Sequence, residues 1–119
     1  MPTIKKPKKS QKNNIDRQKR SEVYSTSTWR KLRLAKQMAN PLCEVCQMEN
    51  KTALTEDIHH LVSFTQFTGV ERDAVAFDYN NLIAVCKYHH YLLHHGFLKG
   101  ATTLEEIEQR INNNEETPL

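Results

Sequence analysis

The sequence predicts a small α+β fold, in which two short strands pack among flanking helices. The chain has 119 residues, of which 38% are hydrophobic, so it suits one compact domain with tails and a modest core. Apolar residues recur at near-helical spacing in several segments, while the continuous run Leu82-Ile-Ala-Val85 is typical of a buried strand. A core of this size often needs a disulfide, a metal ion or a partner to support it.

The basic residues are concentrated in the first third of the chain. Residues 1–40 contain 12 Lys and Arg against two acidic residues, whereas residues 41–119 contain 5 against 12. We expect residues 1–22 to form a basic, flexible arm, because almost no apolar residue precedes Arg20. Such an arm on an acidic body is typical of nucleic-acid binding, although a merely solubilising tail has the same composition. The candidate phosphate contacts are Lys5, Lys6, Lys8, Lys9, Arg17, Arg20, Arg30, Lys31 and Arg33.

The ordered domain is expected over residues 23–111. A helix is predicted over 27–39, because a capping hydroxyl precedes apolar residues at near-helical spacing and Asn40-Pro41 ends the segment. The other predicted elements are, in order, a strand within 52–61, a long loop over 62–80, a strand over 82–85, a helix over about 87–98, a last helix that opens at the Thr103-Leu-Glu-Glu106 capping box and runs through Ile111, and a frayed tail over 112–119.

All three cysteines and all six histidines lie between residues 43 and 95. Cys43-Glu-Val-Cys46 has the two-residue gap of a zinc knuckle, and Cys86-Lys-Tyr-His89 repeats the gap with an imidazole as the fourth donor. These four residues predict a closed, structural zinc site. Reduced cysteines packed as small apolar residues are the first alternative. A redox Cys-x-x-Cys is the second, although no thioredoxin-like βαβ pattern surrounds the motif.

Further histidines lie close to this set. His59 and His60 end the first predicted strand, and His90 directly follows the candidate zinc ligand His89. Neighbouring helical residues diverge by about 100°, so His89 and His90 can serve two different sites. His90 and His94 share one helix face, which suits joint metal binding, with a polar surface residue as the alternative for His94.

The order of these residues resembles that of the HNH endonucleases, above all the small phage-encoded type with a zinc-bound ββα-metal (His-Me finger) core. The resemblance covers about residues 24–95. It rests on Trp29, then Asn40-Pro-Leu-Cys-x2-Cys46, then His59-His60-Leu, then Asn81-Leu-x3-Cys86-x2-His89-His90. It implies an α+β core of two strands and a helix around a catalytic divalent cation, with flanking N- and C-terminal helices and a structural zinc.

The resemblance also implies roles for single residues. His60 matches the general base, and Asn81 matches the residue that orients the base and pins its loop. His59 and His90 match ligands of the catalytic ion, and His94 is a candidate third ligand. Neighbouring strand residues point to opposite faces, so His59 and His60 can share a site only if the strand ends or bulges there. Two residues depart from the family pattern, His89 in place of a fourth cysteine and Ser63 in place of a common proline.

The implied activity is metal-dependent hydrolysis of DNA that leaves 5′-phosphate and 3′-hydroxyl ends. The catalytic ion would be Mn²⁺, Mg²⁺, Ni²⁺, Co²⁺ or Zn²⁺, since imidazole ligands favour the transition metals and substrate oxygens also suit Mg²⁺. Phage proteins of this type commonly act with the terminase, which implies a role in phage DNA packaging. The partner would be the terminase or another larger DNA-processing machine, to which the acidic body would dock. Restriction and homing roles, sequence specificity, and a monomeric or homodimeric state are left open by the sequence.

A non-catalytic zinc-ribbon module that binds nucleic acid is the main alternative function. It would use the basic arm and the Cys3His set, but it leaves His59, His60, Asn81 and His90 without a role. No apolar run approaches the roughly 20 residues that span a bilayer, and the lysine-rich start lacks the apolar segment of a signal peptide. We therefore expect a cytoplasmic protein, in a bacterial or phage-infected cell, with no membrane partner.

Overall fold

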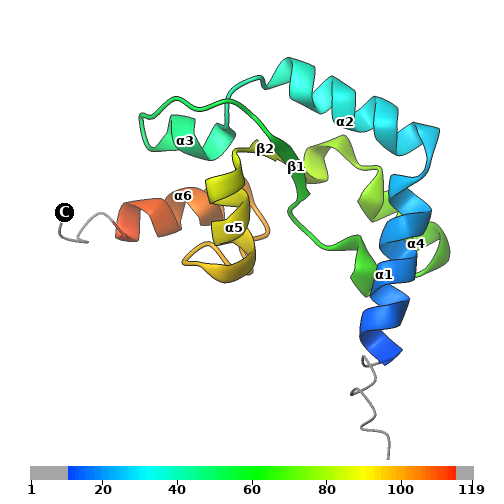
Figure 1. Cartoon of the computed structure of the whole chain (residues 1–119). Coiled ribbons are helices and arrows are strands. Elements are labelled where there is room, and N and C mark those ends of the chain that lie inside the picture. The colour runs from blue at the N-terminus through cyan, green and yellow to red at the C-terminus, as the bar shows by residue number, and fades with distance from the viewer. Residues whose placement is uncertain (1–10, 115–119) are drawn as a thin grey trace, which may run out of the picture.

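The computed structural model describes residues 11–114, and within this range six α-helices surround one two-stranded antiparallel sheet (Figure 1). The predicted α+β class is confirmed. The elements are α1 (Gln11–Tyr24), α2 (Ser27–Ala39), α3 (Glu44–Met48), β1 (Asp57–His60), the 3₁₀ turn η1 (Phe64–Gln66), α4 (Gly69–Ala76), the 3₁₀ turn η2 (Tyr79–Asn81), β2 (Leu82–Val85), α5 (Lys87–His95) and α6 (Leu104–Asn113). None of the described helices is both long enough and apolar enough to cross a membrane.

The sheet is short and its register is simple. β1 and β2 pair so that Asp57 lies opposite Val85 and His60 opposite Leu82. All four residues of β2 are buried, as the apolar run predicts. On the outer edge of β2, the Ala84 N–H donates to the Glu44 carboxylate at 2.8 Å, so an acidic side chain of α3 occupies the position of a third strand.

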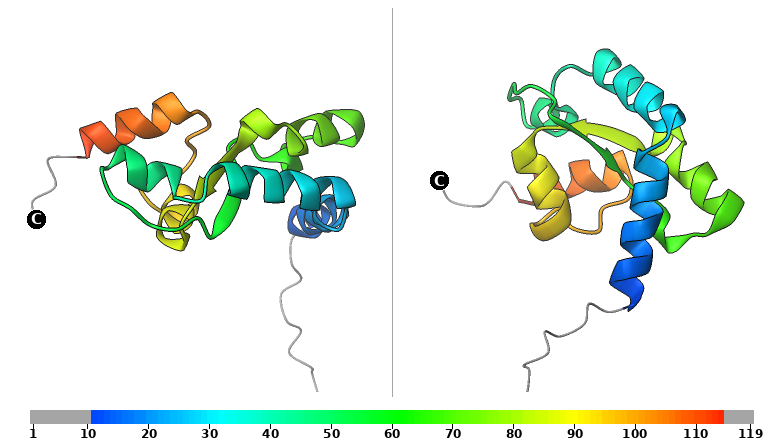
Figure 2. Two further views of the ribbon diagram at one scale, coloured as in Figure 1. Left: turned by 90° about the horizontal axis from the view of Figure 1, so that it is seen from above. Right: turned by 45° about the vertical axis from the view of Figure 1, so that its right-hand side comes forward.

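Helices α2 and α5 lie on opposite sides of the sheet, as Figure 2 shows. The side chains of β1 agree with this arrangement, because successive strand residues point to opposite faces. The His60 ring stacks on Trp29 of α2, whereas the His59 ring packs against His90 of α5. α2 ends at Ala39 as predicted, and its N-cap is Thr26, whose hydroxyl accepts from the Trp29 N–H at 3.1 Å.

The main core lies between α3, β2, α5 and α6. Its fully buried residues include Val45, Ile83, Leu98 and Ile107, and the cysteines pack into the same cluster. α6 begins where the capping box predicts, with the Thr103 hydroxyl accepting from the Glu106 N–H at 3.1 Å. The last helix therefore closes the core that surrounds the cysteines.

The expectation of a flexible arm up to residue 22 is wrong for the described part of that segment. Residues from Gln11 to Tyr24 form α1, so the expected boundary falls inside a helix. Three contacts hold the helix: Val23 is buried against Phe64 and Ala76, the Lys19 ammonium donates to the Thr65 carbonyl at 2.9 Å, and Glu22 forms an ion pair with Arg72. Lys5, Lys6, Lys8 and Lys9 lie outside the described residues.

The predicted loop over 62–80 is also wrong in part, because it contains α4 and two 3₁₀ turns. Phe64 and Ala76, which belong to this segment, are both buried, and their burial explains why the segment is ordered. The remaining differences concern element lengths. The first strand occupies only Asp57–His60, α5 ends at His95 before Gly96, and α6 extends to Asn113 into the expected tail, of which residues 115–119 lie outside the described range.

Candidate metal and active site

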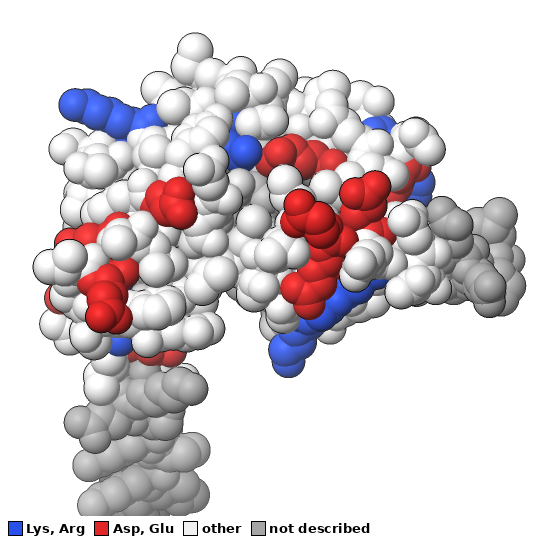
Figure 3. All heavy atoms as spheres, turned by 180° about the vertical axis from the view of Figure 1, so that it is seen from behind, with Lys and Arg blue, Asp and Glu red and all other residues white. Residues whose placement is uncertain are grey.

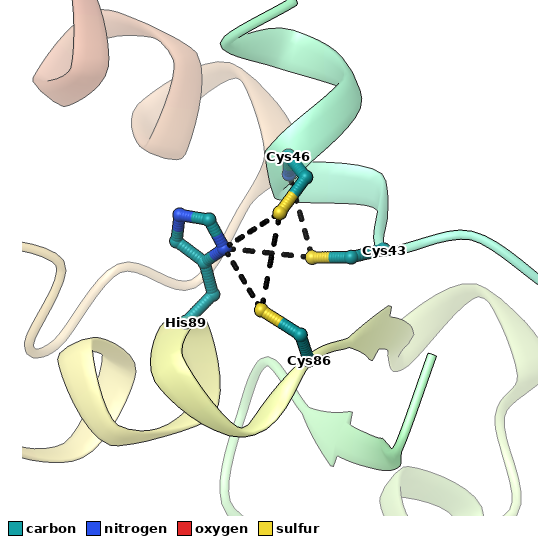
Figure 4. A group of neighbouring side chains, drawn as sticks. All are labelled: Cys43, Cys46, Cys86 and His89. Atoms are coloured by element: carbon teal, nitrogen blue, oxygen red, sulfur yellow. Dashed lines mark hydrogen bonds between the residues drawn. The ribbon is translucent and has the colours of Figure 1, made fainter. Parts of the chain in front are cut away.

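Four buried side chains converge between α3 and α5: Cys43, Cys46, Cys86 and His89 (Figure 4). Each offers one donor atom, and all four atoms lie within 4.8 Å of one another. The His89 Nδ1 atom lies 3.5 Å from the Cys43 sulfur and 3.3 Å from each of the other two sulfurs. The Cys46 and Cys86 sulfurs are 3.9 Å apart.

These distances suit tetrahedral zinc. With ligands at about 2.3 Å for sulfur and about 2.0 Å for nitrogen, neighbouring donors of such a site lie about 3.5–3.8 Å apart. The second ring nitrogen of His89, Nε2, lies 2.5 Å from a carboxylate oxygen of Glu49. Because a carboxylate accepts, Nε2 carries the proton and Nδ1 keeps its lone pair for a metal. The cluster could hold a structural metal ion such as zinc.

The local backbone explains why the sulfurs converge. Cys43 precedes α3 as its N-cap, and its sulfur accepts from the Cys46 N–H at 3.4 Å. Cys86 is likewise the N-cap of α5, which places His89 one turn later on the same side. Burial, together with the neighbouring Cys43 and Cys86 sulfurs, raises the pKa of the Cys46 thiol to about 12. A bound cation would remove this penalty, since metal binding favours the thiolate.

A second cluster contains His59 of β1 with His90 and His94 of α5. One ring nitrogen from each lies within 4.8 Å of the others, and the Nε2 atoms of His90 and His94 are 3.1 Å apart. Burial, followed by the neighbouring histidines His94, His90 and His60, lowers the pKa of His59 to about 3. His59 is therefore neutral near pH 7, and a neutral imidazole is the form that binds a metal ion.

Asp57 orients one member of this cluster. Its carboxylate lies 3.0 Å from His90 Nδ1, so that nitrogen carries the proton and Nε2 keeps the lone pair that faces His94. Asp57 and His59 lie two residues apart on β1 and share a face of the strand. The donor set of three imidazoles with a supporting carboxylate suits Mn²⁺, Ni²⁺, Co²⁺ or Zn²⁺.

His60 lies beside this cluster in a different environment. Its ring is buried, stacks on Trp29 with centroids 4.8 Å apart, and meets Phe64 edge-on. Its Nε2 lies 2.9 Å from the Ala76 carbonyl, which can only accept, so Nε2 carries the proton and Nδ1 has the free lone pair. Burial lowers the pKa of His60, and the bond to Ala76 opposes this effect in part. The strand ends at His60, as sharing a site with His59 requires.

Asn81 ties together the segments on either side of His60. Its Oδ1 accepts from the Val62 N–H at 2.8 Å, and its Nδ2 donates to the Val62 and Val75 carbonyls at 2.9 and 3.1 Å. Val62 follows the strand that carries His60, and Val75 precedes the carbonyl that orients the His60 ring. Asn81 therefore fixes both the position and the orientation of that histidine.

His60 and the histidine cluster open into one pocket of about 170 Å³, which Arg20 and Tyr24 of α1 also line. An adjoining pocket of about 430 Å³ lies between α2 and β1 and is lined by Arg30 and Arg33. Of the described candidates for nucleic-acid contact, these three arginines lie next to the site. Arg17 and Lys31 are exposed on the same two helices but line neither of these pockets.

Three groups of this site were not predicted from the sequence. Glu49 and Asp57 orient His89 and His90, and the Ala76 carbonyl orients His60. The alternation of β1 could have indicated Asp57, because residues 57 and 59 share a face. Glu49 and the Ala76 carbonyl have no such signal, since their contacts depend on how separate segments pack.

Comparison with known proteins gives no relative to set beside this geometry: no family model, no curated protein and no solved structure matches the chain.

Proposed function

We propose that this protein is a metal-dependent DNA endonuclease of the HNH type, which hydrolyses phosphodiester bonds and leaves 5′-phosphate and 3′-hydroxyl ends. One observation carries the proposal. A buried histidine with one free ring nitrogen shares a pocket with three clustered imidazoles and an arginine. A zinc-ribbon module that only binds nucleic acid would need the basic residues and the Cys3His cluster, but not this pocket.

His60 is the candidate general base. Its low pKa keeps the ring neutral near pH 7, and its Nδ1 atom can accept a proton from the attacking water. The Ala76 carbonyl and the stacked Trp29 ring hold the imidazole in one orientation. Asn81 bonds to the Val75 carbonyl, one residue before Ala76, and to Val62 after the strand, so it acts as a positioning residue.

His59, His90 and His94 would hold a divalent cation in the same pocket. Such an ion would stabilise the negative charge that develops on the phosphate and on the leaving 3′ oxygen. Asp57 keeps His90 in the tautomer that binds metal. The neutral state of His59 leaves its lone pair available without competition from a proton.

Plasmid nicking tests this function directly. We expect supercoiled DNA to be converted to the nicked form with added Mn²⁺ and to stay intact in EDTA. His60→Ala should lower the nicking rate by about 100- to 10,000-fold, the usual contribution of a general base. Zinc content and DNA affinity should remain nearly unchanged in that variant. End-labelling should identify 5′-phosphate and 3′-hydroxyl products.

His95→Ala provides the matched control, because His95 is exposed on α5 and lies outside both clusters. Its nicking rate should equal that of the unaltered protein. DNA binding without nicking under any of the four transition metals or Mg²⁺ would favour the zinc-ribbon alternative. Full activity of His60→Ala would remove His60 from the mechanism.

A further inference from the structure

The two pockets beside β1 adjoin each other, since they share Tyr24, Ile58 and His90 as lining residues. We call the two adjoining pockets together the groove. The smaller pocket contains the histidines and Arg20, and the larger contains Arg30 and Arg33. Guanidinium groups therefore line both the pocket that contains the histidines and the pocket next to it.

The groove arginines Arg20, Arg30 and Arg33 form no ion pair with a described residue, and neither does Arg17 outside the groove. Arg72, by contrast, pairs with Glu22 and Asp73, and Arg110 pairs with Glu106. Unpaired guanidinium groups in a hollow are available to an anionic ligand, and their planar fork matches a phosphate.

The carboxylates of the groove form no ion pair with these arginines. Glu56 and Asp57 line the larger pocket, where Glu56 accepts from the Lys87 N–H at 2.8 Å and Asp57 bonds to His90. Both acidic groups therefore have their hydrogen-bond partners on α5. The smaller pocket has no acidic lining residue.

Tyr24 provides an aromatic surface where the two pockets meet. Its side chain is 42% exposed, while its ring packs against Trp29 and Phe64, with centroids 5.3 and 5.6 Å apart. The ring is thus held in place with one part open to the groove. Burial raises the pKa of the Tyr24 phenol, so it stays uncharged, and the nearby Arg20 charge opposes that rise. Aromatic faces of this kind stack on nucleotide bases whatever their sequence.

We infer that this groove holds the DNA strand that is cut. Arg20 binds the phosphate on one side of the scissile phosphate, and Arg33 binds the phosphate on the other side. Tyr24 contacts the nucleotide between these two phosphates. The inference rests on the proposed function and assigns the path of its substrate. It divides the basic residues of α1 and α2 into groove contacts and bystanders. Arg17 and Lys31 are the bystanders, since both are exposed and line neither pocket.

The test compares four single variants of the full chain, Arg20→Ala, Arg33→Ala, Arg17→Ala and Lys31→Ala. Binding to a fluorescein-labelled 20-base-pair duplex is followed by anisotropy at several salt concentrations, without added divalent ion. We expect the two groove variants to bind about 5- to 20-fold more weakly, each with a salt slope reduced by about one. The two controls should lose less than about 2-fold. Equal losses in all four variants would overturn the assignment.

A second measurement locates the contacts on the strand. Neutral methylphosphonate replaces one phosphate at a time around the mapped cleavage position. The unaltered protein should lose affinity at the two positions that flank the scissile phosphate, and Arg33→Ala should lose no further affinity at one of them. If Arg33→Ala is still as sensitive as the unaltered protein at every position, the proposed contact is absent.

The binding assay also separates this inference from the proposed function, because it does not depend on cleavage. Selective loss of binding in the groove variants, with no nicking by the unaltered protein, would overturn the nuclease proposal and support a DNA-binding groove. Nicking by the unaltered protein, with equal losses in all four variants, would support the nuclease and overturn the groove.

Discussion

At the scale of single residues, neighbours in the sequence serve different chemistry because of helix and strand geometry. His89 and His90 are adjacent, but the turn of α5 directs one toward the cysteines and the other toward His59. His59 and His60 are adjacent on β1 and lie against helices on opposite sides of the sheet. These two pairs of adjacent histidines thus contribute to two candidate metal clusters and one candidate general base.

Asp57→Asn should weaken divalent-ion binding at the histidine cluster. The amide keeps the shape of the side chain but can no longer fix the His90 tautomer through a charged acceptor, and such changes typically cost 10–100-fold in metal affinity. The measurement is a Mn²⁺ titration followed by calorimetry and by nicking rate. Zinc content should not change.

The control is Glu56→Gln, one residue earlier, whose carboxylate accepts from the Lys87 N–H and touches no histidine. Its Mn²⁺ affinity should match that of the unaltered protein. An equal loss in both variants would mean that Asp57 acts only through general negative charge.

At the scale of elements, α5 connects the two clusters. It begins at Cys86, carries His89 into the Cys3His set, and presents His90 and His94 to β1. Any change that releases the start of this helix from the cysteines would also displace the histidines next to it. A metal ion bound by the first cluster is therefore expected to control the geometry of the second.

Cys86→Ser should leave the protein unfolded at 25 °C, so that no cooperative unfolding transition is seen on heating. Binding of structural zinc contributes roughly 10–16 kcal/mol in small zinc domains, which is as large as the whole stability of a typical domain. Circular dichroism melting and zinc analysis would check the result, and excess zinc chelator should give the same loss with the unaltered protein. His95→Ala, on the exposed side of α5, should melt normally with one zinc bound. A folded, zinc-free Cys86→Ser protein would contradict the assignment.

Val23→Ala should release α1 from the rest of the fold. Val23 is 1% exposed and packs with Phe64 and Ala76, so losing two methyl groups should lower the free energy of unfolding by about 2 kcal/mol. Amide hydrogen exchange in α1 should rise in parallel. Ile15→Ala on the same helix is the control, because Ile15 is 45% exposed and should change stability by less than about 0.5 kcal/mol.

Local signals in the sequence were enough to predict some elements. The proline after Asn40 predicted the end of α2, the apolar run predicted β2, and Thr103 predicted the start of α6. α1 could not be predicted in this way, because its order depends on contacts with Thr65 and Arg72, more than 40 residues away. α4 was missed for the same reason, since Ala76 is buried in a cluster with Phe64 and Val23.

The residues of the candidate site also divide into those that local sequence signals indicated and those that depend on long-range contacts. Cysteine and histidine spacing predicted the Cys3His donors, and the structure brings these four side chains together. The resemblance to HNH endonucleases indicated His59, His60, Asn81 and His90, and the structure places them around one strand end. Of the two carboxylates that fix histidine tautomers, Asp57 could have been indicated by the alternation of β1, although its partner His90 is 33 residues away. Glu49 had no such signal, because its contact with His89 joins segments that are 40 residues apart.

At the scale of the whole molecule, the charge is unevenly distributed. Acidic side chains gather in patches on the face seen in Figure 3, over both halves of the molecule. A DNA backbone would be repelled from that face. The basic residues belong mainly to the first 40 residues of the chain, so α1, α2 and the segment before them are expected to supply the electrostatic attraction.

Deletion of residues 1–9 should reduce the salt dependence of DNA binding. The deletion removes four lysines, and each phosphate contact that they make contributes about 0.9 to the slope of log affinity against log salt. We expect the slope to fall by about three to four, with melting temperature unchanged because α1 begins at Gln11. Anisotropy titrations at several salt concentrations provide the measurement. An unchanged slope would show that these lysines do not contact DNA.

The contact between Glu44 and the Ala84 N–H has a consequence for self-association. A two-stranded sheet leaves unpaired backbone groups along its margins, and these can recruit strands from other chains and lead to aggregation. Glu44 blocks this margin of β2, and Lys36 holds its carboxylate through an ion pair at 3.2 Å. Glu44 lies between Cys43 and Cys46, so demetallated protein would lose this protection and is expected to precipitate as intermolecular β-structure.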